Sequence, residues 1–324
     1  MTGQIPTRPI REPLTEDMFA PLQPHEKKVL LWTKLDDQQM QRVVQIMRPH
    51  PDIGLSILCF DLIDLDFLKN FPWLKTLDAA GSSHTLESID GMRHLTQLET
   101  LEFPPTKKRF SLKILENFPN LTRLVLERLD TKSPDLDVVA ACMQLRTLSL
   151  ISDKFENLDF LRGLPKLHHL GVNMGRCSDL SSITTLPELR SLSIYQTKVQ
   201  DITPIAHCAQ LRHLDIESTS TITELPDLST AHNLRSMTLS SLKNLRCISP
   251  LLTAPELTYL IVGDLHPDLK PDDYAILNNH PALEYLHAFG RNKKLDEETA
   301  RITNRKPGVE EAQTEYIRTL AAAK

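Results

Sequence analysis

The chain is short of aromatic residues and glycines, and each shortage excludes a class of function. Aromatic residues make up 5% of the 324 residues, which argues against a nucleic-acid platform built from stacked rings. The net charge of -5 also disfavours DNA and RNA, whose phosphates attract a basic surface. With only ten glycines, the sequence contains none of the patterns GxGxxG, GxxxxGK[ST], HExxH or GxSxG. We therefore expect no nucleic-acid partner, no cofactor and no metal.

Cysteines are few and far apart. An odd number with no CxxC pair indicates reduced thiols in a reducing compartment. Residues 1–14 carry three prolines and no apolar core of the kind that a secretory signal has. No stretch approaches 18 apolar residues, so no membrane span is expected. The sequence thus predicts a cytoplasmic protein, and it gives no indication of the oligomeric state. The five cysteines are Cys59, Cys142, Cys177, Cys208 and Cys247.

A repeated LxxLxL string organises the chain. Its alternation predicts a short strand whose leucines point inward. The apolar triplet that follows, such as Leu180, Ile183 and Leu186, predicts a 3₁₀ or one-turn helix, which a proline often ends. The starts lie 19 to 26 residues apart, which is the period of a stacked repeat array. The eleven starts are Leu55, Leu74, Leu98, Leu121, Leu145, Leu167, Leu189, Leu211, Leu234, Leu257 and Leu283.

Over residues 55–290 this repeat resembles the leucine-rich-repeat family, above all the 22-residue class of internalins and phosphatase-regulatory proteins. The copy over residues 189–210 fits that pattern best. The resemblance implies an α/β fold: a right-handed solenoid with a concave parallel sheet and short 3₁₀ or helical turns on the convex side. The family usually has Asn at the ninth position of the repeat, where a ladder of Asn side chains ties neighbouring repeats together. This sequence has other residues there, so the Asn ladder is absent. That position is occupied by Asp153, Gly175, Thr197 and Thr219.

A repeat array needs caps at both ends. In the N-terminal cap we expect one helix over residues 24–35 and a second over 36–47, which Asp36 would N-cap. Near the other end, residues 271–279 and 295–303 have helical patterns. The expected organisation is a flexible proline-containing arm (1–14), a helical N-terminal cap (15–54), about eleven repeats (55–290), and a C-terminal helical cap and tail (291–324).

The third, fifth and seventh residues of each repeat should point to the concave face. Acids in these columns favour a protein partner, with a basic partner as one option, although a face kept charged for solubility explains them equally well. Tyrosines are typical anchors of interfaces; for Tyr285, packing under the C-terminal cap is the alternative. The candidate partner-binding residues are Asp61, Asp78, Glu102, Arg123, Glu127, Tyr195, Asp215, Glu217, Tyr259 and Tyr285.

The second position of the repeat carries bases that would stack about 4.8 Å apart. This lateral basic stripe could bind an acidic surface. The alternative is a solvated row whose long stems cover the leucines. Besides His168, the stripe consists of Arg146, Arg190, Arg212 and Arg235.

Candidate chemistry is sparse. Asp215 and Glu217 share a strand face, but nothing else of an acid–base site accompanies them. The string Cys177-Ser178-Asp179 matches the CxD motif of bacterial effector ubiquitin ligases, yet it lies inside a repeat. His169 and His213 fall two repeats apart, roughly 10 Å, which is too far for one zinc ion. No catalytic residue is predicted.

The sequence favours a non-enzymatic protein-binding module that uses its concave face. A bacterial toxin-neutralising (immunity) protein is an alternative, and a hydrolase or thiol enzyme is the alternative of another class.

Overall fold

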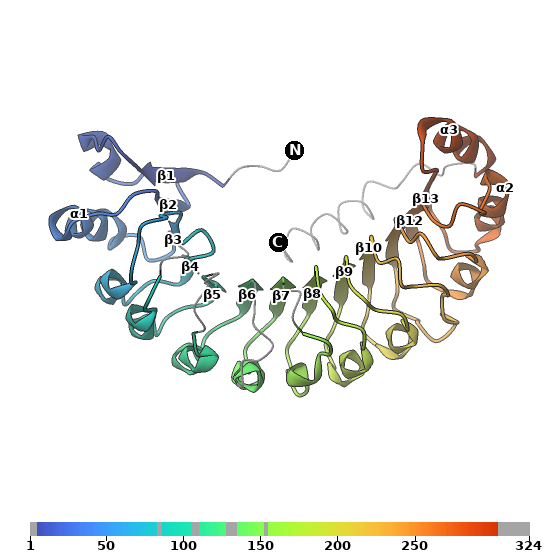
Figure 1. Cartoon of the computed structure of the whole chain (residues 1–324), viewed down its shortest axis with the longest axis horizontal. Helices are drawn as coiled ribbons and strands as arrows, with labels where there is room; N and C mark the ends of the chain where they lie inside the picture. Colours follow the sequence, from blue (N-terminus) through green and yellow to red (C-terminus); the bar gives the residue numbers. More distant parts are fainter. Residues whose placement is uncertain (1–4, 83–85, 105–109, 128–134, 152–154, 304–324) are drawn as a thin grey trace. The chain divides into compact units, whose positions relative to one another are not determined.

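The computed structural model describes residues 5–82, 86–104, 110–127, 135–151 and 155–303. The chain forms two compact units, Met1–Leu145 and Arg146–Lys324. In each unit, parallel strands alternate along the chain with short helical turns (Figure 1).

In its described residues the first unit contains six strands that follow one another in chain order. The strands are β1 (Thr7–Ile10), β2 (Lys28–Leu31), β3 (Gly54–Ile57), β4 (Thr76–Asp78), β5 (Thr100–Glu102) and β6 (Arg123–Glu127). The helical segments described in this unit are one α-helix and five 3₁₀ turns, the last of which follows β6: η1 (Glu16–Phe19), α1 (Asp37–Met47), η2 (Asp66–Asn70), η3 (Asp90–His94), η4 (Leu112–Asn117) and η5 (Leu136–Ala141).

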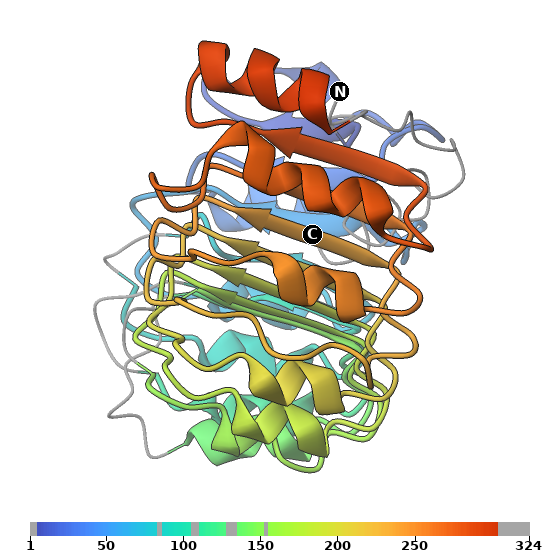
Figure 2. The same ribbon diagram turned by 90° about the vertical axis from the view of Figure 1, so that its right-hand side faces the viewer.

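The part of the second unit that the structure describes contains seven strands, also in chain order. They are β7 (Thr147–Ile151), β8 (His169–Asn173), β9 (Ser191–Tyr195), β10 (His213–Glu217), β11 (Ser236–Ser240), β12 (Tyr259–Gly263) and β13 (Tyr285–Phe289). Its helical segments are η6 (Asp159–Leu161), η7 (Ser181–Thr185), η8 (Thr203–His207), η9 (Ser249–Thr253), α2 (Pro271–Tyr274), η10 (Ala275–Asn279) and α3 (Lys293–Ile302). Figure 2 shows these strands stacked on one another, with α3 lying beyond β13 at the end of the sheet.

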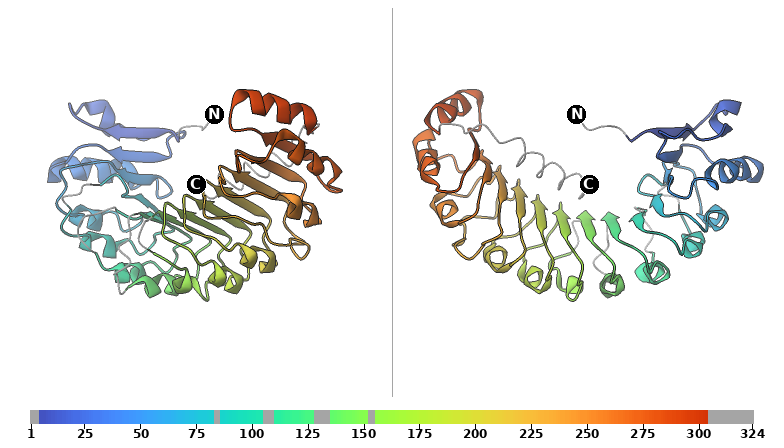
Figure 3. Two further views of the ribbon diagram at one scale, coloured as in Figure 1. Left: turned by 45° about the vertical axis from the view of Figure 1, so that its right-hand side comes forward. Right: turned by 180° about the vertical axis from the view of Figure 1, so that it is seen from behind.

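Ten predicted repeats coincide with strands β4 to β13, and the first predicted string overlaps β3 in a shifted register. The parallel strands and short 3₁₀ turns confirm the leucine-rich-repeat solenoid. In the repeat strands the fourth and sixth residues are buried, as with Leu192 and Ile194 on β9. Alternation then turns the third, fifth and seventh residues to the opposite face of the sheet. In the second unit the strands lie on the inner side of the curve and the 3₁₀ turns on the outer side (Figure 3). The exposed sheet face is therefore separate from the leucine core.

The backbone turns sharply at the eighth position of five consecutive repeats in the second unit. Each of these residues has a positive φ of 51° to 55°. Its N–H then donates to the carbonyl of the seventh-position residue in the next repeat. The Gln196 N–H, for example, donates to the Glu217 carbonyl at 3.1 Å. The turn thus extends the ladder of hydrogen bonds beyond the strands. The five residues are Met174, Gln196, Ser218, Ser241 and Asp264.

Threonine takes over part of the role that asparagine has in the family pattern. Thr197 and Thr219 at the ninth position are buried. The Thr197 N–H donates to the Thr219 hydroxyl at 3.4 Å, and that hydroxyl donates to the Glu217 carbonyl at 3.2 Å. Two neighbouring repeats are therefore linked by hydroxyls in place of amides. Asp153, expected at the equivalent position, lies outside the described residues.

The predicted helix over residues 24–35 is wrong, because Lys28–Leu31 form strand β2. Val29 and Leu31 alternate into the core, and β2 pairs on both sides with β1 and β3. The expectation of a flexible arm over residues 1–14 is also wrong for Thr7–Ile10, which form β1. Pro9 is tolerated in β1 because an edge strand does not need every N–H.

The other predicted cap helices are confirmed. Helix α1 begins after Asp36, whose carboxylate accepts from the Gln39 N–H at 2.8 Å in a capping box. Residues 271–279 form α2 and η10, and α3 follows the N-cap Asn292. The tail from residue 304 lies outside the described residues.

Candidate functional site

Strand pairing in register places equivalent positions of neighbouring repeats side by side. On β9, β10 and β11 the fifth-position residues are Ser193, Asp215 and Thr238. The seventh-position residues at the carboxyl ends of these strands are Tyr195, Glu217 and Ser240. We call the seventh-position residues of β7 to β13 the carboxyl-end row.

Exposure is uneven across this face. In the second unit most third-position residues are buried, whereas every residue of the carboxyl-end row except Gly263 is partly exposed. Access for a partner is therefore better towards the carboxyl ends of the strands than at the third position. The sequence alone did not reveal this gradient. The carboxyl-end row consists of Ile151, Asn173, Tyr195, Glu217, Ser240, Gly263 and Phe289.

The assignment of Asp61 to a strand face is wrong. Leu55 pairs with Leu77, which is the fourth residue of its repeat, so the first LxxLxL string is out of register by three residues. Ser56 therefore occupies the fifth position. Asp61 lies beyond the strand, where its carboxylate accepts a hydrogen bond from the Cys59 thiol at 2.9 Å.

The acid on β4 is compensated within the first unit. The Asp78 carboxylate accepts from the Ser56 hydroxyl at 2.6 Å and lies 3.2 Å from the Lys28 ammonium. Lys28 belongs to β2, a strand that the repeat pattern did not reveal. This arrangement turns a candidate anionic contact into an internal ion pair.

Glu102 on β5 and Arg123 on β6 lie on neighbouring strands, two positions apart in the register, and their charges interact. Burial raises the pKa of Glu102, and the negative charge of Asp78 adds to the rise. Burial lowers the pKa of Arg123, while the nearby Glu102 charge works against that change. Glu127 is partly exposed at the end of β6. Apart from Glu127, the charges on this face are largely compensated by opposite charges of the same unit.

The acid on the carboxyl-end row of the second unit is different. Glu217 lies between Tyr195 and Ser240. Within the described residues, no Lys, Arg or His forms an ion pair with its carboxylate. Asp215 lies two residues earlier on the same strand face, which adds negative potential close by. The Glu217 carboxylate therefore presents a negative charge at the partly exposed carboxyl-end row.

The two candidate tyrosines of β12 and β13 stack on each other. Their ring centroids are 4.3 Å apart and the planes differ by 6°. Tyr259 is only 4% exposed, so its ring supports Tyr285 rather than standing free. Tyr285 is partly exposed, and Phe289 contacts His287 with centroids 5.7 Å apart.

Acids just before the next LxxLxL string partly neutralise the lateral basic stripe. Glu188 lies 3.0 Å from His168 and 3.5 Å from Arg190. Arg235 pairs with Glu256 at 2.9 Å. Arg146 and Arg212 are exposed and form no ion pair with any residue that the structure describes. The stripe is thus broken into separate charges.

The thiols are poorly suited to catalysis. Burial raises the pKa of Cys177 to about 11, and its thiol donates to the Asp179 carbonyl. Burial raises the pKa of Cys142 to about 11 and that of Cys208 to about 12. Because the thiolate is the reactive form, these groups are unreactive at neutral pH.

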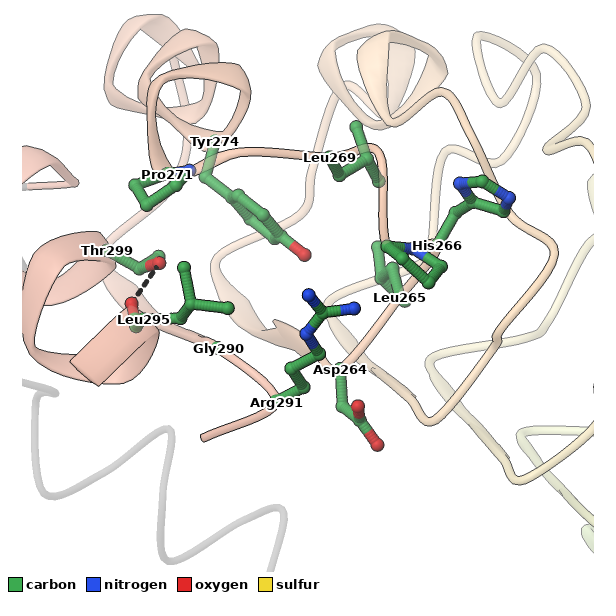
Figure 4. Close-up of a pocket in the computed structure, with 11 residues that line it drawn as sticks. Asp264, Leu265, His266, Leu269, Pro271, Tyr274, Gly290, Arg291, Leu295 and Thr299 are labelled. Atoms are coloured by element: carbon green, nitrogen blue, oxygen red, sulfur yellow. Dashed lines mark hydrogen bonds between the residues drawn. The ribbon is translucent and has the colours of Figure 1, made fainter. Parts of the chain in front are cut away.

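A small cavity lies beneath α3 in the second unit (Figure 4). Its volume is about 20 Å³, which suits one water molecule. Tyr274 and Leu295 line it, and burial, followed by the charge of Asp264, raises the pKa of Tyr274 to about 12. The cavity is a packing feature of the C-terminal cap, too small for an organic ligand.

Among the residues that the structure describes, no three His, Cys, Asp or Glu side chains gather as metal ligands. Every helix in the described part of the chain is too short or too polar to cross a bilayer.

Comparisons with known proteins agree on the fold. No family model matches the chain, and no curated protein matches it in sequence. An internalin (inlF) of Listeria monocytogenes is similar in structure, with a TM-score of 0.60 and 18% identity over 85% of this chain and 76% of that one. A leucine-rich-repeat protein of Leptospira interrogans gives a TM-score of 0.54 and 15% identity over 89% of this chain and 92% of that one. The chain therefore has the leucine-rich-repeat solenoid fold.

Proposed function

We propose that the chain is a non-enzymatic protein-binding module whose partner docks on the strand face of the second unit. The observation that carries this proposal is the carboxyl-end row, where Tyr195 and Glu217 are partly exposed side by side. Partly exposed aromatic rings are typical anchors of interfaces, and a carboxylate without an internal ion pair can be complemented by a cation of the partner. The residues of the first unit and of the lateral stripe would contribute less, because many of them pair internally.

Rigidity supports the same function. The Tyr195 carbonyl accepts from the Met174 N–H at 2.8 Å, and the Glu217 carbonyl accepts from the Gln196 N–H at 3.1 Å. The backbone beneath both side chains is thus held from the preceding repeat. A surface that is ordered before binding loses less entropy when the partner docks.

An enzymatic function is less well supported. Asp215 and Glu217 lie on an open sheet face, where water is not excluded from a reacting group. The raised pKa of Cys177 works against a thiol nucleophile. All five cysteines are free, which supports a reducing compartment such as the cytoplasm.

The test is affinity capture from native lysate with mass spectrometry. One variant, Ser193→Arg with Ser240→Arg, adds two long cations to the strand face. The control, Thr184→Arg with His207→Arg, adds the same groups to the exposed turns η7 and η8. We expect the control to retain the partner of the native chain and the face variant to lose it, with equal melting temperatures. Equal capture by both variants would exclude the strand face as the binding site.

A further inference from the structure

We propose that Tyr195 and Glu217 form a subsite for one arginine side chain of the partner. This inference rests on the proposed function and adds the chemistry of the contact. The two residues are direct neighbours in the β9–β10 register, so their backbones lie about 4.8 Å apart. A tyrosine ring and a carboxylate at that spacing can be contacted by the same guanidinium group.

Charge gives the subsite its preference. Among the acids on the strand faces, Asp78 has Lys28 and Glu102 has Arg123 nearby. Glu217 forms no ion pair with any cation that the structure describes. An added cation at Glu217 therefore completes a pair without breaking an existing one. A partner whose contact is acidic or purely apolar would leave this carboxylate uncompensated, which costs binding energy.

Shape favours arginine over lysine. Tyr195 and Glu217 are flanked by the small residues Ser193 and Ser240, which leave room above the sheet for a planar group. A guanidinium can donate two hydrogen bonds to one carboxylate while its plane stacks on the ring. An ammonium is a compact point charge and cannot form the same forked contact. Asp215 adds negative potential for either cation.

Met174 provides a reporter next to the subsite. It is 49% exposed, and its N–H donates to the carbonyl of Tyr195. Met143 is 51% exposed but lies outside the strands, in the turn before β7. The two methyl groups therefore distinguish binding at the subsite from unspecific binding by an equally exposed methionine.

The experiment is a methyl NMR titration of the full chain with short peptides of sequence Gly-Ser-X-Ser-Gly, blocked at both ends. X is arginine, lysine or citrulline, which has the shape of arginine without its charge. We expect the arginine peptide to shift the Met174 methyl signal saturably, with a dissociation constant of about 1 mM, and to leave Met143 unchanged. Lysine should bind several-fold more weakly, and citrulline should not bind measurably.

Variants localise the effect. Glu217→Gln and Tyr195→Ala should each weaken arginine binding by about tenfold or more. Tyr195→Phe, which keeps the ring, and Glu224→Gln, an exposed acid off the strand face, should bind as the native chain does. Equal shifts at Met174 and Met143, equal binding of citrulline, or no effect of Glu217→Gln would overturn the arginine subsite. Such a result would leave the docking function to be judged by the capture experiment, which does not depend on arginine.

Discussion

Gln196 holds a backbone conformation that most side chains avoid. Its φ is 51°, in the left-handed region, where a Cβ costs roughly 1 kcal/mol. Its side chain is exposed, so replacing it removes few contacts. Gln196→Gly should therefore raise the free energy of unfolding by up to about 1 kcal/mol, whereas Gln196→Val should lower it by roughly 1–2 kcal/mol.

Urea denaturation of these variants measures the difference. The control is Gln200→Gly, because Gln200 is also exposed but has no positive φ; glycine should destabilise there. If glycine destabilises equally at both positions, the left-handed turn at the eighth position carries no strain.

Glu102 links stability to pH. Because its pKa is raised in the folded chain, first by burial and then by Asp78, the folded state binds this proton more tightly than the unfolded state. The resulting stabilisation is present below the unfolded pKa of about 4.3 and is lost as the pH rises through the folded pKa. Glu102→Gln should therefore raise the melting temperature at neutral pH, and the gain should vanish below about pH 4.

Thermal unfolding across a pH series checks this. Glu99→Gln is the matched control three residues earlier in the same repeat, where the carboxylate is exposed and lies 3.8 Å from the Lys75 ammonium; we expect little change from it. A lower melting temperature of Glu102→Gln at pH 7 would mean that attraction to Arg123 outweighs burial.

Strand β1 is held in place by one buried ion pair. The Arg8 guanidinium donates to Glu26 at 2.6 and 2.8 Å and to the Ala20 carbonyl at 3.0 Å. Burial alone would raise the pKa of Glu26, but the hydrogen bonds from the Gln23 N–H and Arg8 outweigh it, and the pKa is lowered. Arg8→Met should cost roughly 3 kcal/mol, because it leaves a buried carboxylate without its partner.

Chemical denaturation with hydrogen exchange at β1 measures the loss. The double variant Arg8→Met with Glu26→Met removes both charges, and it should recover a large part of the stability. If the double variant is less stable than the single one, the loss in Arg8→Met comes from the missing Arg8–Glu26 attraction and not from an unpaired buried carboxylate.

The C-terminal helix α3 depends on a close backbone approach at Gly290. A Cβ at this position would lie 2.4 Å from the Leu295 Cβ and 2.5 Å from its carbonyl carbon. Gly290→Ala should therefore push α3 away from β13 and cost about 2 kcal/mol. Gly171→Ala is the control, because its Cβ would meet nothing closer than 3.5 Å. The expected readout is a lower melting temperature with faster hydrogen exchange in α3 for Gly290→Ala alone. Equal melting temperatures would show that the cap can shift at no cost.

Across the whole chain, what the sequence could predict follows from the leucines. The recurrence of the leucines predicts the repeat strands, and pairing of these strands in register places Tyr195 beside Glu217. Strand β2 has no LxxLxL string, so neither the strand nor the Lys28–Asp78 ion pair could be foreseen across a separation of 50 residues. The burial of Tyr259 depends on its stacking partner in the next repeat. Packing and pairing between repeats, rather than local pattern, decide which charges and rings a partner can reach.

The same packing sets the chemistry of all five thiols. Cys59, Cys142, Cys177 and Cys208 are buried, and only Cys247 is exposed. Burial raises the pKa of the four buried thiols to about 11 or 12, so they hold little thiolate at neutral pH. A disulfide reagent that releases a coloured thiolate should therefore react rapidly with one thiol in the native chain and with five in denaturant. Cys247→Ser should abolish the rapid reaction. Fast reaction of a second thiol in that variant would reveal an activated cysteine and would reopen the thiol-enzyme alternative that the buried packing of Cys177 argues against.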